Sequence, residues 1–495
     1  MLNVKQQLTA DKLEKFIKQN LHKIFYLIGY AGTGKTFIVS RFTKDLLLSN
    51  KLDNIYYCAP THKALNVLQS YIRSNLTQSE SDVLSDKIRF MTIHKLLEFK
   101  PVIQTDTGSK IFKSTKESKF LKKINNILVV VDECSMIPKE MVDELERYSD
   151  LYPIKFLFLG DPKQLPPVGE PESLIFSKIP INYEYHIVLD EIMRTKSPDI
   201  KDVCSLIRNW NTTENINKPL LEIYKRSKIK KFRLYHKREN DTESSWFKNF
   251  IKEVNENNIP IILTWKNSTS EYYNNIIRQF IHKSTNLSDY MENDYLIFNN
   301  FYVSEENCES FYTSDMVKII SVNVSEKILF DWLTLLVSQP KTDVDRGFNS
   351  LIKKLSKQKN KFKINILHIK RIQSDVIGVH TDDINIIYTV SITDLLSYKD
   401  TLKNIKEHIE FFYKKYRSEK YTTKLWDIFH KKLIEPFAEI NFGFSITTHK
   451  SQGSTYNSVY VDVQDICSNT NSLEMQKSLY TAAGRSANKL GFMIE

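Results

Sequence analysis

The sequence lacks the features that mark metal-binding, disulfide-linked and membrane proteins. Its five cysteines are scattered along 495 residues, with no CxxC pair and no histidines at metal-ligand spacing. This pattern argues against a zinc site, an iron–sulfur cluster and a disulfide framework. No apolar stretch reaches the roughly 20 residues that a membrane-spanning helix needs. The N-terminal segment MLNVKQQLTADKLEKF is too polar for a secretory signal. We therefore expect a soluble protein of a reducing compartment: the cytoplasm, or a nucleus or viral replication site if the source is eukaryotic or viral.

The charge balance favours a polyanionic partner. Lysine and arginine number 70 against 59 aspartate and glutamate residues, which gives a formal net charge of +11. Each basic side chain that meets a phosphate releases a condensed counterion, so an excess of this size suits nucleic acid. Net charge also serves solubility, so the excess alone does not establish such binding.

Short apolar runs alternate with helical patterns over the first part of the chain, which is typical of a parallel sheet wrapped by helices. Four of these runs are predicted to be buried strands: Ile24–Ile28, Ile55–Cys58, Ile127–Val131 and Phe156–Leu159. Polar residues follow each run at once, which places them at the carboxyl edge of the sheet, where open α/β folds bind ligands. A hairpin is predicted at 99–113, because Val102 and Ile103 can pair with Ile111 and Phe112 across a turn.

A second α/β series is expected to begin near His186–Leu189, and an insertion of different character interrupts it. The series continues with these runs: Ile261–Thr264, Phe442–Ile446 and Val459–Val461. Within residues 295–437, three runs look like antiparallel strands of a small barrel: Met316–Ile320, Ile364–Leu367 and Ile384–Tyr388. Apolar residues then recur at helical spacing, which predicts an amphipathic helix: Leu402, Ile405, Ile409, Phe412 and Tyr416.

The length exceeds what one hydrophobic core usually organises, so we expect several structural units. The predicted fold class is α/β, with a first domain at 1–180 that carries the hairpin. A second domain is expected in two parts, at 181–294 and 438–495, on either side of the insertion at 295–437.

A phosphate-binding loop follows the first predicted strand. Gly29–Thr36 satisfies GxxxxGK(S/T), and its glycines let successive backbone N–H groups point at a β-phosphate. Lys35 would neutralise phosphate charge, and the Thr36 hydroxyl would reach Mg²⁺. The strand context makes an ordinary glycine turn a poor alternative. The nucleotide contacts expected from this loop are Gly29, Ala31, Gly32, Thr33, Gly34, Lys35 and Thr36.

Two carboxylates close a strand beside this loop. Asp132 would hold Mg²⁺ through water, and Glu133 would orient and deprotonate the attacking water. Acidic residues end many strands, so the pair is a weak signal alone and a strong one together with the phosphate loop. ATP and Mg²⁺ are therefore the expected cofactors.

Taken in order, the motifs resemble those of superfamily 1B helicases, in particular the RecD-like and Dda-like DNA helicases. Gln6 or Gln7 stands where such enzymes read adenine. In the first half of the chain, Ala59–Ala64 matches motif Ia and Thr92–Leu97 the next DNA-contacting motif. Gly160–Pro167 matches motif III, and Leu189–Thr195 matches motif IV. In the second half, Thr264–Asn267, followed by Asn275 and Arg278, matches the stretch that opens the second motor domain's DNA contacts. Thr447–Ser454 matches motif V, and Leu479–Ser486 matches motif VI.

The resemblance implies a role for individual residues. Gln164 would sense the γ-phosphate, Arg194 and Arg485 would be arginine fingers, and Gly453 would adjoin the nucleotide. Contacts to nucleic acid are implied for ten residues: Pro60, Thr61, His62, Lys63, Thr92, His94, Phe99, Asn267, Thr447 and Lys450. Phe112 and Trp265 are further candidate platforms for unstacked bases. Histidines and aromatics of this kind are often core residues instead.

The resemblance also implies an architecture and a direction. Both motor domains would be RecA-like, the insertion SH3-like with a helix that approaches the hairpin, and the hairpin the pin that splits a duplex. Travel would be 5′→3′ on single-stranded DNA. Thr195 and Gly484 depart from the family's usual Gln and Thr, but both arginines are kept, so hydrolysis is expected to survive.

The spacing has a physical meaning without the family. The phosphate loop and the Asp132-Glu133 pair lie in one α/β domain, whereas Arg194 would begin the other and Arg485 would end it. An arginine from a facing domain stabilises the transition state only when the cleft is closed, which ties hydrolysis to movement.

Three other functions stay open at this stage. The chain could be a motor on RNA or a translocase that does not unwind, because motifs do not show discrimination of the 2′-hydroxyl. A catalytically idle scaffold would not need the full set of catalytic residues, and a nucleoside kinase needs no second α/β domain. The expected partners are single-stranded and forked DNA and a single-strand-binding protein or replisome component, with the chain itself a monomer.

Overall fold

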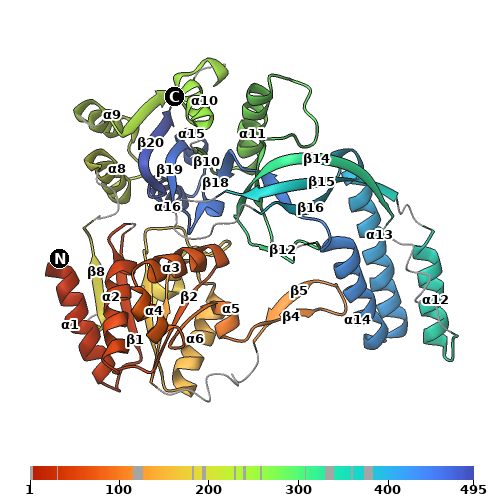
Figure 1. The fold of residues 1–495 in the computed structure, drawn as a ribbon, viewed down its shortest axis with the longest axis horizontal. Coiled ribbons are helices and arrows are strands. Elements are labelled where there is room, and N and C mark those ends of the chain that lie inside the picture. The colour runs from red at the N-terminus through yellow and green to blue at the C-terminus, as the bar shows by residue number, and fades with distance from the viewer. Residues whose placement is uncertain are drawn as a thin grey trace.

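The computed structural model describes twelve stretches of the chain: 4–30, 32–114, 126–180, 183–191, 197–227, 230–237, 241–256, 259–306, 308–328, 339–357, 361–372 and 383–494. Two parallel sheets wrapped by helices lie side by side, and an antiparallel sheet with an arm of helices extends from them (Figure 1). Within these stretches no helix is both long and apolar enough to cross a membrane.

The first unit is built on a six-stranded parallel sheet in the order β3-β2-β6-β7-β1-β8. Its strands are β1 (Ile24–Gly29), β2 (Asn54–Ala59), β3 (Ile88–Thr92), β6 (Ile127–Val131), β7 (Ile154–Gly160) and β8 (His186–Leu189). Its helices are α1 (Val4–Lys18), α2 (Lys35–Leu48), α3 (His62–Ser74), α4 (Gln78–Leu84), α5 (Ile93–Leu96), α6 (Lys139–Leu151) and α7 (Leu174–Ser177). The central strands are continuous apolar runs because helices cover both faces of the sheet, and a separate core cluster lies on each face.

The assignment of His186–Leu189 to the second α/β series is wrong. This strand, β8, pairs in parallel with β1, from Tyr26 opposite His186 to Gly29 opposite Leu189. The first sheet therefore extends beyond the predicted boundary at 180. The misassignment arose because a short apolar run does not indicate which of two sheets it joins.

The second unit is also a parallel sheet, in the order β18-β10-β19-β20-β9. Its strands are β9 (Phe232–His236), β10 (Ile261–Thr264), β18 (Ser445–Thr447), β19 (Tyr456–Asp462) and β20 (Ser486–Ile494). Its helices are α8 (Pro198–Asn209), α9 (Asn217–Arg226), α10 (Ser245–Asn255), α11 (Asn267–His282), α15 (Val463–Cys467) and α16 (Ser472–Ala483). The two predicted parts of this domain thus combine in one sheet, since β10 pairs with both β18 and β19. This confirms the α/β class with two parallel-sheet units.

The insertion contains a five-stranded antiparallel sheet in the order β16-β15-β14-β11-β17. Its strands are β11 (Tyr295–Phe298), β14 (Met316–Ile328), β15 (Lys361–Arg371), β16 (Asn385–Val390) and β17 (Ile440–Phe442), with a small pair β12 (Tyr302–Val303) and β13 (Ser310–Phe311) beside it. The Ala438 amide donates to the Tyr388 carbonyl at 2.7 Å. This bond brings the edge strand β16 close to the segment before the other edge strand, β17, and the sheet closes around one apolar cluster. The three predicted antiparallel strands are confirmed, and β17 extends the sheet beyond the predicted end at 437. Its likeness to an SH3 domain stays a prediction.

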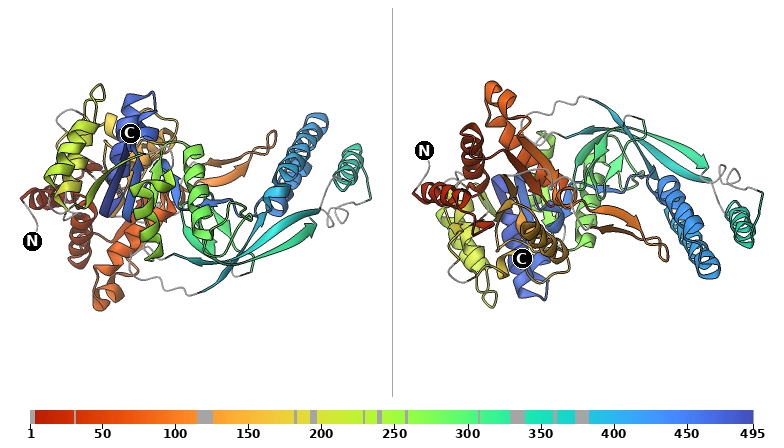
Figure 2. Two further views of the ribbon diagram at one scale, coloured as in Figure 1. Left: turned by 90° about the horizontal axis from the view of Figure 1, so that it is seen from above. Right: turned by 90° about the horizontal axis from the view of Figure 1, so that it is seen from below.

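A helical arm adjoins the antiparallel sheet and lies at the end of the molecule farthest from the two parallel-sheet units (Figure 2). It comprises α12 (Asp343–Leu355), α13 (Ile392–Tyr416) and α14 (Glu419–Ile428), which continues in π-helical turns over Phe429–Ile434. The predicted amphipathic helix is confirmed as α13, whose Ile405, Ile409 and Phe412 are buried in the core of the arm.

The predicted hairpin is present as β4 (Lys100–Ile103) and β5 (Lys110–Lys113). Its register differs by one residue from the expected pairing of Val102-Ile103 with Ile111-Phe112, because Val102 lies opposite Ile111 and Ile103 opposite Lys110. It projects from the first unit toward the helical arm (Figure 1). At its tip, the Trp426 indole N–H donates to the Thr105 carbonyl at 2.9 Å, and a His430 ring nitrogen lies 2.8 Å from the Gly108 carbonyl. The approach predicted for the long helix α13 is thus made by α14 and the π-helical turns that follow it.

Candidate active site

The phosphate loop joins β1 to α2, as the motif requires. Gly32 and Gly34 have φ of 79° and 80°, in the left-handed region that favours glycine, and they let the loop curl. A Cβ at Gly29 would lie 2.6 Å from Thr33 Oγ1, so a side chain there would disrupt the loop. Lys35, the first residue of α2, folds back over the loop and donates to the Gly29 carbonyl at 2.6 Å. The positive N-terminal end of a 14-residue helix and an ammonium thus face the same loop.

A hydroxyl and a carboxylate meet beside this loop. Thr36 Oγ1 donates to Asp132 Oδ2 at 3.2 Å, and Asp132 follows β6 directly. Burial, together with the charge of Glu133, raises the pKa of Asp132 above its ordinary value. Glu133 adopts a left-handed φ of 49°, which is uncommon for a residue with a side chain and typical of functional sites. Hard oxygen donors of this kind fit Mg²⁺, which binds proteins through one or two carboxylates or hydroxyls and keeps its other ligands from water and phosphate.

The structure distinguishes the two glutamines proposed to read adenine. Gln6 is buried, and its amide Nε2 lies 3.3 Å from the position that a Cβ on Gly34 would occupy. Gln7 is exposed and donates to Asp11 instead. Gln6 is therefore the glutamine that adjoins the phosphate loop.

Arg485 and Gln164 meet across the interface between the two parallel-sheet units. Arg485 Nη2 donates to Gln164 Oε1 at 2.7 Å, and the two residues are only 3% and 5% exposed. The guanidinium also donates from Nη1 to the Ser454 carbonyl and from Nε to the Thr481 carbonyl. Three N–H donors of the planar guanidinium are thus held in place. A lysine has a single ammonium group and does not reproduce this geometry.

Further hydrogen bonds join the same two units. The Gln452 amide donates to the Leu165 carbonyl at 3.1 Å, and the Leu165 amide donates to Thr481 Oγ1 at 3.3 Å. The Tyr480 hydroxyl donates to the buried Asp161 at 2.9 Å. Sequence reasoning included these residues in motifs but assigned them no role. The available signal was the position of Tyr480 and Thr481, one helical turn before Arg485.

Two proposed site residues lie outside the described residues. Ala31 of the phosphate loop is one, and Arg194, the other proposed finger, falls in the undescribed stretch 192–196. Gly453 is placed against motif Ia, since a Cβ there would lie 3.3 Å from the Ala64 Cβ, and its φ is +73°.

The hydroxyl residues proposed to contact nucleic acid lie at carboxyl ends of neighbouring strands. Thr92 ends β3 and lies opposite Ala59 of β2, which Pro60 and Thr61 follow. Thr61 and Thr92 also begin helices, because their hydroxyls accept from the amides of residues three positions later. In the second sheet, Thr447 ends β18 opposite Thr264, and Asn267 begins the helix that follows. The two sheets thus present small polar residues at corresponding edges.

Two lysines of this set meet on one residue of the insertion. Lys63 Nζ donates to the Ser314 carbonyl at 2.8 Å, and the Ser314 hydroxyl donates to the Lys450 carbonyl at 3.0 Å. Lys450 Nζ in turn donates to Asn299 Oδ1 at 2.9 Å. His62 stacks on Tyr312, with ring centres 4.0 Å apart. Sequence reasoning missed these insertion residues, because positions 136 to 251 residues apart give no local signal of contact.

Two predicted nucleic-acid contacts require correction. Phe99 is 9% exposed and packs in the core of the first unit, so it is a core residue; Phe112 on the hairpin is 50% exposed. His94 lies between them, 5.9 Å and 5.2 Å from their ring centres. Arg278 is 5% exposed, and its guanidinium is paired with the fully buried Asp294 at 2.8 Å, so it is not free to meet a phosphate. Trp265 is half-buried against the core of the second unit.

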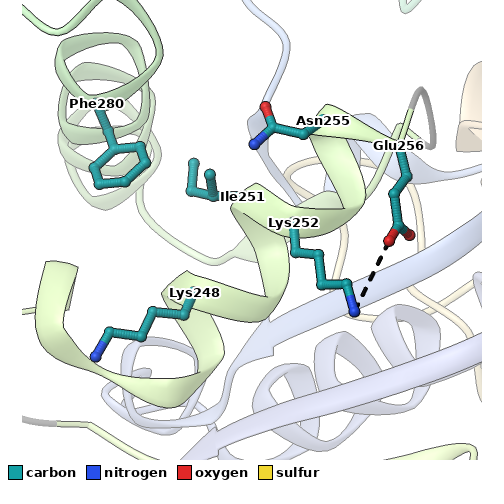
Figure 3. A pocket seen from close by; sticks show the side chains of 6 residues that line it. All are labelled: Lys248, Ile251, Lys252, Asn255, Glu256 and Phe280. Carbon is teal, nitrogen blue, oxygen red and sulfur yellow. Dashed lines mark ion pairs between the residues drawn. The ribbon is translucent and has the colours of Figure 1, made fainter.

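An open surface hollow of about 470 Å³ lies between α10 and α11 (Figure 3). It is lined by Lys248, Ile251, Lys252, Asn255, Glu256 and Phe280. None of the predicted site residues lines it, so it is separate from the nucleotide and nucleic-acid residues described above.

Two family models match the chain, one in each motor unit. Residues 14–170 match the model described as AAA domain, and residues 442–493 match the UvrD-like helicase C-terminal domain. The first match contains the phosphate loop and Asp132, and the second contains Thr447, Gly453 and Arg485.

Two relatives match over nearly the whole chain. Uncharacterized protein R530 of Acanthamoeba polyphaga mimivirus is 66% identical over 495 residues, which is all of both chains. Uncharacterized protein MJ1519 of Methanocaldococcus jannaschii is 24% identical over 493 residues, and the chain spans 37% of its length.

Solved structures of two Pif1 helicases are similar to the chain at low TM-scores. The crystal structure of Pif1 helicase from Candida albicans gives a TM-score of 0.43 at 13% identity, over 100% of this chain and 95% of that one. The structure of Pif1 helicase from Bacteroides in complex with ADP-AlF3 and ssDNA gives 0.45 at 14% identity, over 99% and 92%. Because these scores are low, the assignment rests on the sequence matches: the chain belongs to the same family as the mimivirus protein R530, and it carries an AAA domain followed by a UvrD-like helicase C-terminal domain.

Proposed function

We propose that the protein is an ATP-dependent DNA helicase that travels 5′→3′ on a single strand and separates the duplex ahead of it. The observation that carries the proposal is the buried contact between Arg485 and Gln164. It joins the last motif of the second unit to a motif of the first, near the phosphate loop. A motor needs such a connection, because hydrolysis must depend on how the two units approach each other.

The proposed hydrolysis site uses residues of both units. Lys35 and the loop amides bind the phosphates, while Gln6 contacts the adenine. Thr36 and Asp132 would hold Mg²⁺, which when bound neutralises charge on the β- and γ-phosphates. Glu133 orients the attacking water and takes its proton. Arg485, together with Arg194, stabilises the charge that develops in the transition state.

The proposed track runs along the carboxyl edges of the two sheets. Backbone phosphates would be held by small hydroxyls, amides and lysines rather than by base-reading contacts, which gives position without sequence choice. These residues are Pro60, Thr61, His62, Lys63, Thr92, His94, Asn267, Thr447 and Lys450. Phe112 replaces Phe99 as the proposed stacking platform.

The hairpin is the proposed wedge. A pin that splits base pairs must resist the force of the advancing duplex, and an isolated two-stranded hairpin is only marginally stable. Anchoring of the tip by Trp426 and His430 of the helical arm provides that support. On this proposal the first motor unit comprises residues 1–191. The second motor unit comprises residues 197–294 together with 443–494, and the insertion spans 295–442.

Unwinding of two labelled duplexes tests the proposal, one with a 5′ tail and one with a 3′ tail, with ATP and Mg²⁺. Unwinding of the 5′-tailed duplex alone is the expected result. Activity only on the 3′-tailed duplex would keep the motor but reverse the direction. DNA-stimulated hydrolysis without unwinding would indicate a translocase, and stronger stimulation by single-stranded RNA than by DNA would indicate an RNA-directed motor.

A further inference from the structure

A cation–π contact joins the phosphate loop to the second motor unit. The guanidinium carbon of Arg208 lies 3.8 Å from the centre of the Tyr30 ring. Tyr30 is the second residue of the phosphate loop, and Arg208 lies in the last turn of α8. The two residues therefore belong to opposite walls of the interface that Gln164 and Arg485 also cross.

The aromatic partner is fixed to the loop. The Tyr30 amide donates to the Leu189 carbonyl at 3.3 Å, at the sheet edge formed by β8. Its carbonyl accepts from the Thr33 amide at 3.2 Å and from Lys35 Nζ at 3.3 Å. Any force on the Tyr30 backbone is thus transmitted to the residues proposed to bind phosphates.

The cationic partner is fixed to the helix that precedes Arg485. Gln476 of α16 donates its amide to the carbonyls of Ile207, Arg208 and Trp210, at 2.9, 3.2 and 2.9 Å. α16 ends at Ala483, two residues before Arg485. Arg208 and Arg485 are therefore expected to move together, as parts of one rigid wall.

The guanidinium of Arg208 is directed at the ring rather than at a carboxylate. It donates to Ser205 Oγ at 3.3 Å, and no ion pair of Arg208 occurs within the described stretches. Asp190, at the end of β8, has a pKa lowered first by the hydrogen bond from Lys5 and also by the charge of Arg208. This charge effect is consistent with a position of Arg208 over the edge of the first sheet.

We propose that Tyr30 and Arg208 form a clasp across the nucleotide cleft that slows the departure of a nucleoside diphosphate. The proposal rests on the ATPase function proposed above. One partner belongs to the phosphate loop and the other to the facing wall, so the cleft opens only after the contact breaks. Both are positioning residues: they hold the cleft closed, and the reacting atoms belong to Lys35, Glu133 and Arg485.

Release of a fluorescent ADP analogue from the full chain, followed by stopped flow, tests the clasp. A partly desolvated cation–π contact is worth about three- to tenfold in an equilibrium constant. We expect Tyr30→Ala and Arg208→Ala each to speed release and raise KM for ATP by about that factor, with kcat not lowered in Arg208→Ala. The double variant is expected to release no faster than either single variant. Tyr30→Phe keeps the ring and is expected to restore slow release.

Arg226→Ala is the matched control, because Arg226 is an exposed arginine on the neighbouring helix α9 of the same unit. Release at the wild-type rate from both single variants, additive effects in the double variant, or fast release from Tyr30→Phe would each overturn the clasp. Failure of the proposed function is distinguishable, because a wild-type chain that binds the analogue but does not hydrolyse ATP still reports the clasp through release. A wild-type chain that does not bind the analogue would overturn both proposals.

Discussion

Arg485 of the second motor unit donates a 2.7 Å hydrogen bond to Gln164 of the first, and both side chains are buried. A buried guanidinium and a buried amide need partners, so any opening at this point must provide replacements for both groups. On the proposed function, this contact would couple the distance between the two units to the state of the nucleotide site.

Removal of the arginine should stop hydrolysis while leaving nucleotide bound. We expect Arg485→Ala to lower kcat by about 10³-fold or more, the range of arginine fingers. Arg485→Lys should recover little, because one ammonium does not replace three fixed donors of a planar fork. Steady-state ATPase assays with and without single-stranded DNA measure this effect. An Arg485→Lys variant with wild-type kcat would contradict the assigned geometry.

The two residues of the phosphate site have separable effects. Lys35→Ala should abolish turnover and leave single-strand binding largely intact, because the hydrogen bonds that Lys35 forms with described residues go to the phosphate loop. Glu133→Gln should bind ATP yet retain it, since the amide accepts no proton from water. Rapid mixing with labelled ATP and a filter-binding assay for DNA measure both. Undiminished hydrolysis by Lys35→Ala would remove that residue from the site.

Burial of Asp294 predicts a stability effect away from the nucleotide. Asp294 is fully buried and accepts hydrogen bonds from Arg278 and His282 at the end of α11. Asp294→Ala would leave the Arg278 guanidinium buried without its partner, which typically costs about 3–5 kcal/mol. Urea unfolding should show the loss, with Asp343→Ala on the exposed start of α12 as control. Equal stability of the two variants would mean that Arg278 finds another partner.

Local patterns in the sequence predicted the phosphate loop, the Asp132-Glu133 pair, the hairpin and the antiparallel strands. Each of these depends on neighbouring residues, and the chain folds there as the pattern indicates. Long-range relationships were not predictable in the same way. The pairing of β8 with β1 and the paired burial of Arg278 depend on which surfaces meet, and a single sequence does not record that choice.

The site shows the same division. Gln164 and Arg485 were assigned roles by their motifs, yet their direct contact joins positions 321 residues apart. The clasp between Tyr30 and Arg208 and the meeting of Lys63 with Ser314 likewise arise only when separate elements pack. A motif thus predicts which residue carries a chemical group, whereas the fold decides which other group faces it.

Support of the hairpin by the helical arm predicts a separation of hydrolysis from unwinding. Lys110 on the hairpin forms an ion pair with Glu435, and a His430 ring nitrogen contacts the Gly108 carbonyl beside it. In the double variant, His430→Ala removes the hydrogen bond to the Gly108 carbonyl, and Lys110→Glu replaces the attraction to Glu435 by a repulsion. We expect unwinding of a 5′-tailed duplex to fall, while DNA-stimulated hydrolysis stays within about twofold, because neither substitution alters a residue of the proposed nucleotide site.

A charge swap provides the control for this prediction. Lys110→Glu combined with Glu435→Lys restores an attractive pair in the reverse order and should recover unwinding that Lys110→Glu alone loses. Exposed ion pairs are individually worth about 0–1 kcal/mol, so the effect of the single change is expected to be a few-fold at most. Unwinding at the wild-type rate in the variant with both His430→Ala and Lys110→Glu would mean that the tip needs no anchor. An equal fall in hydrolysis would mean that the anchor supports the motor itself, since the two activities would then share one structural cause.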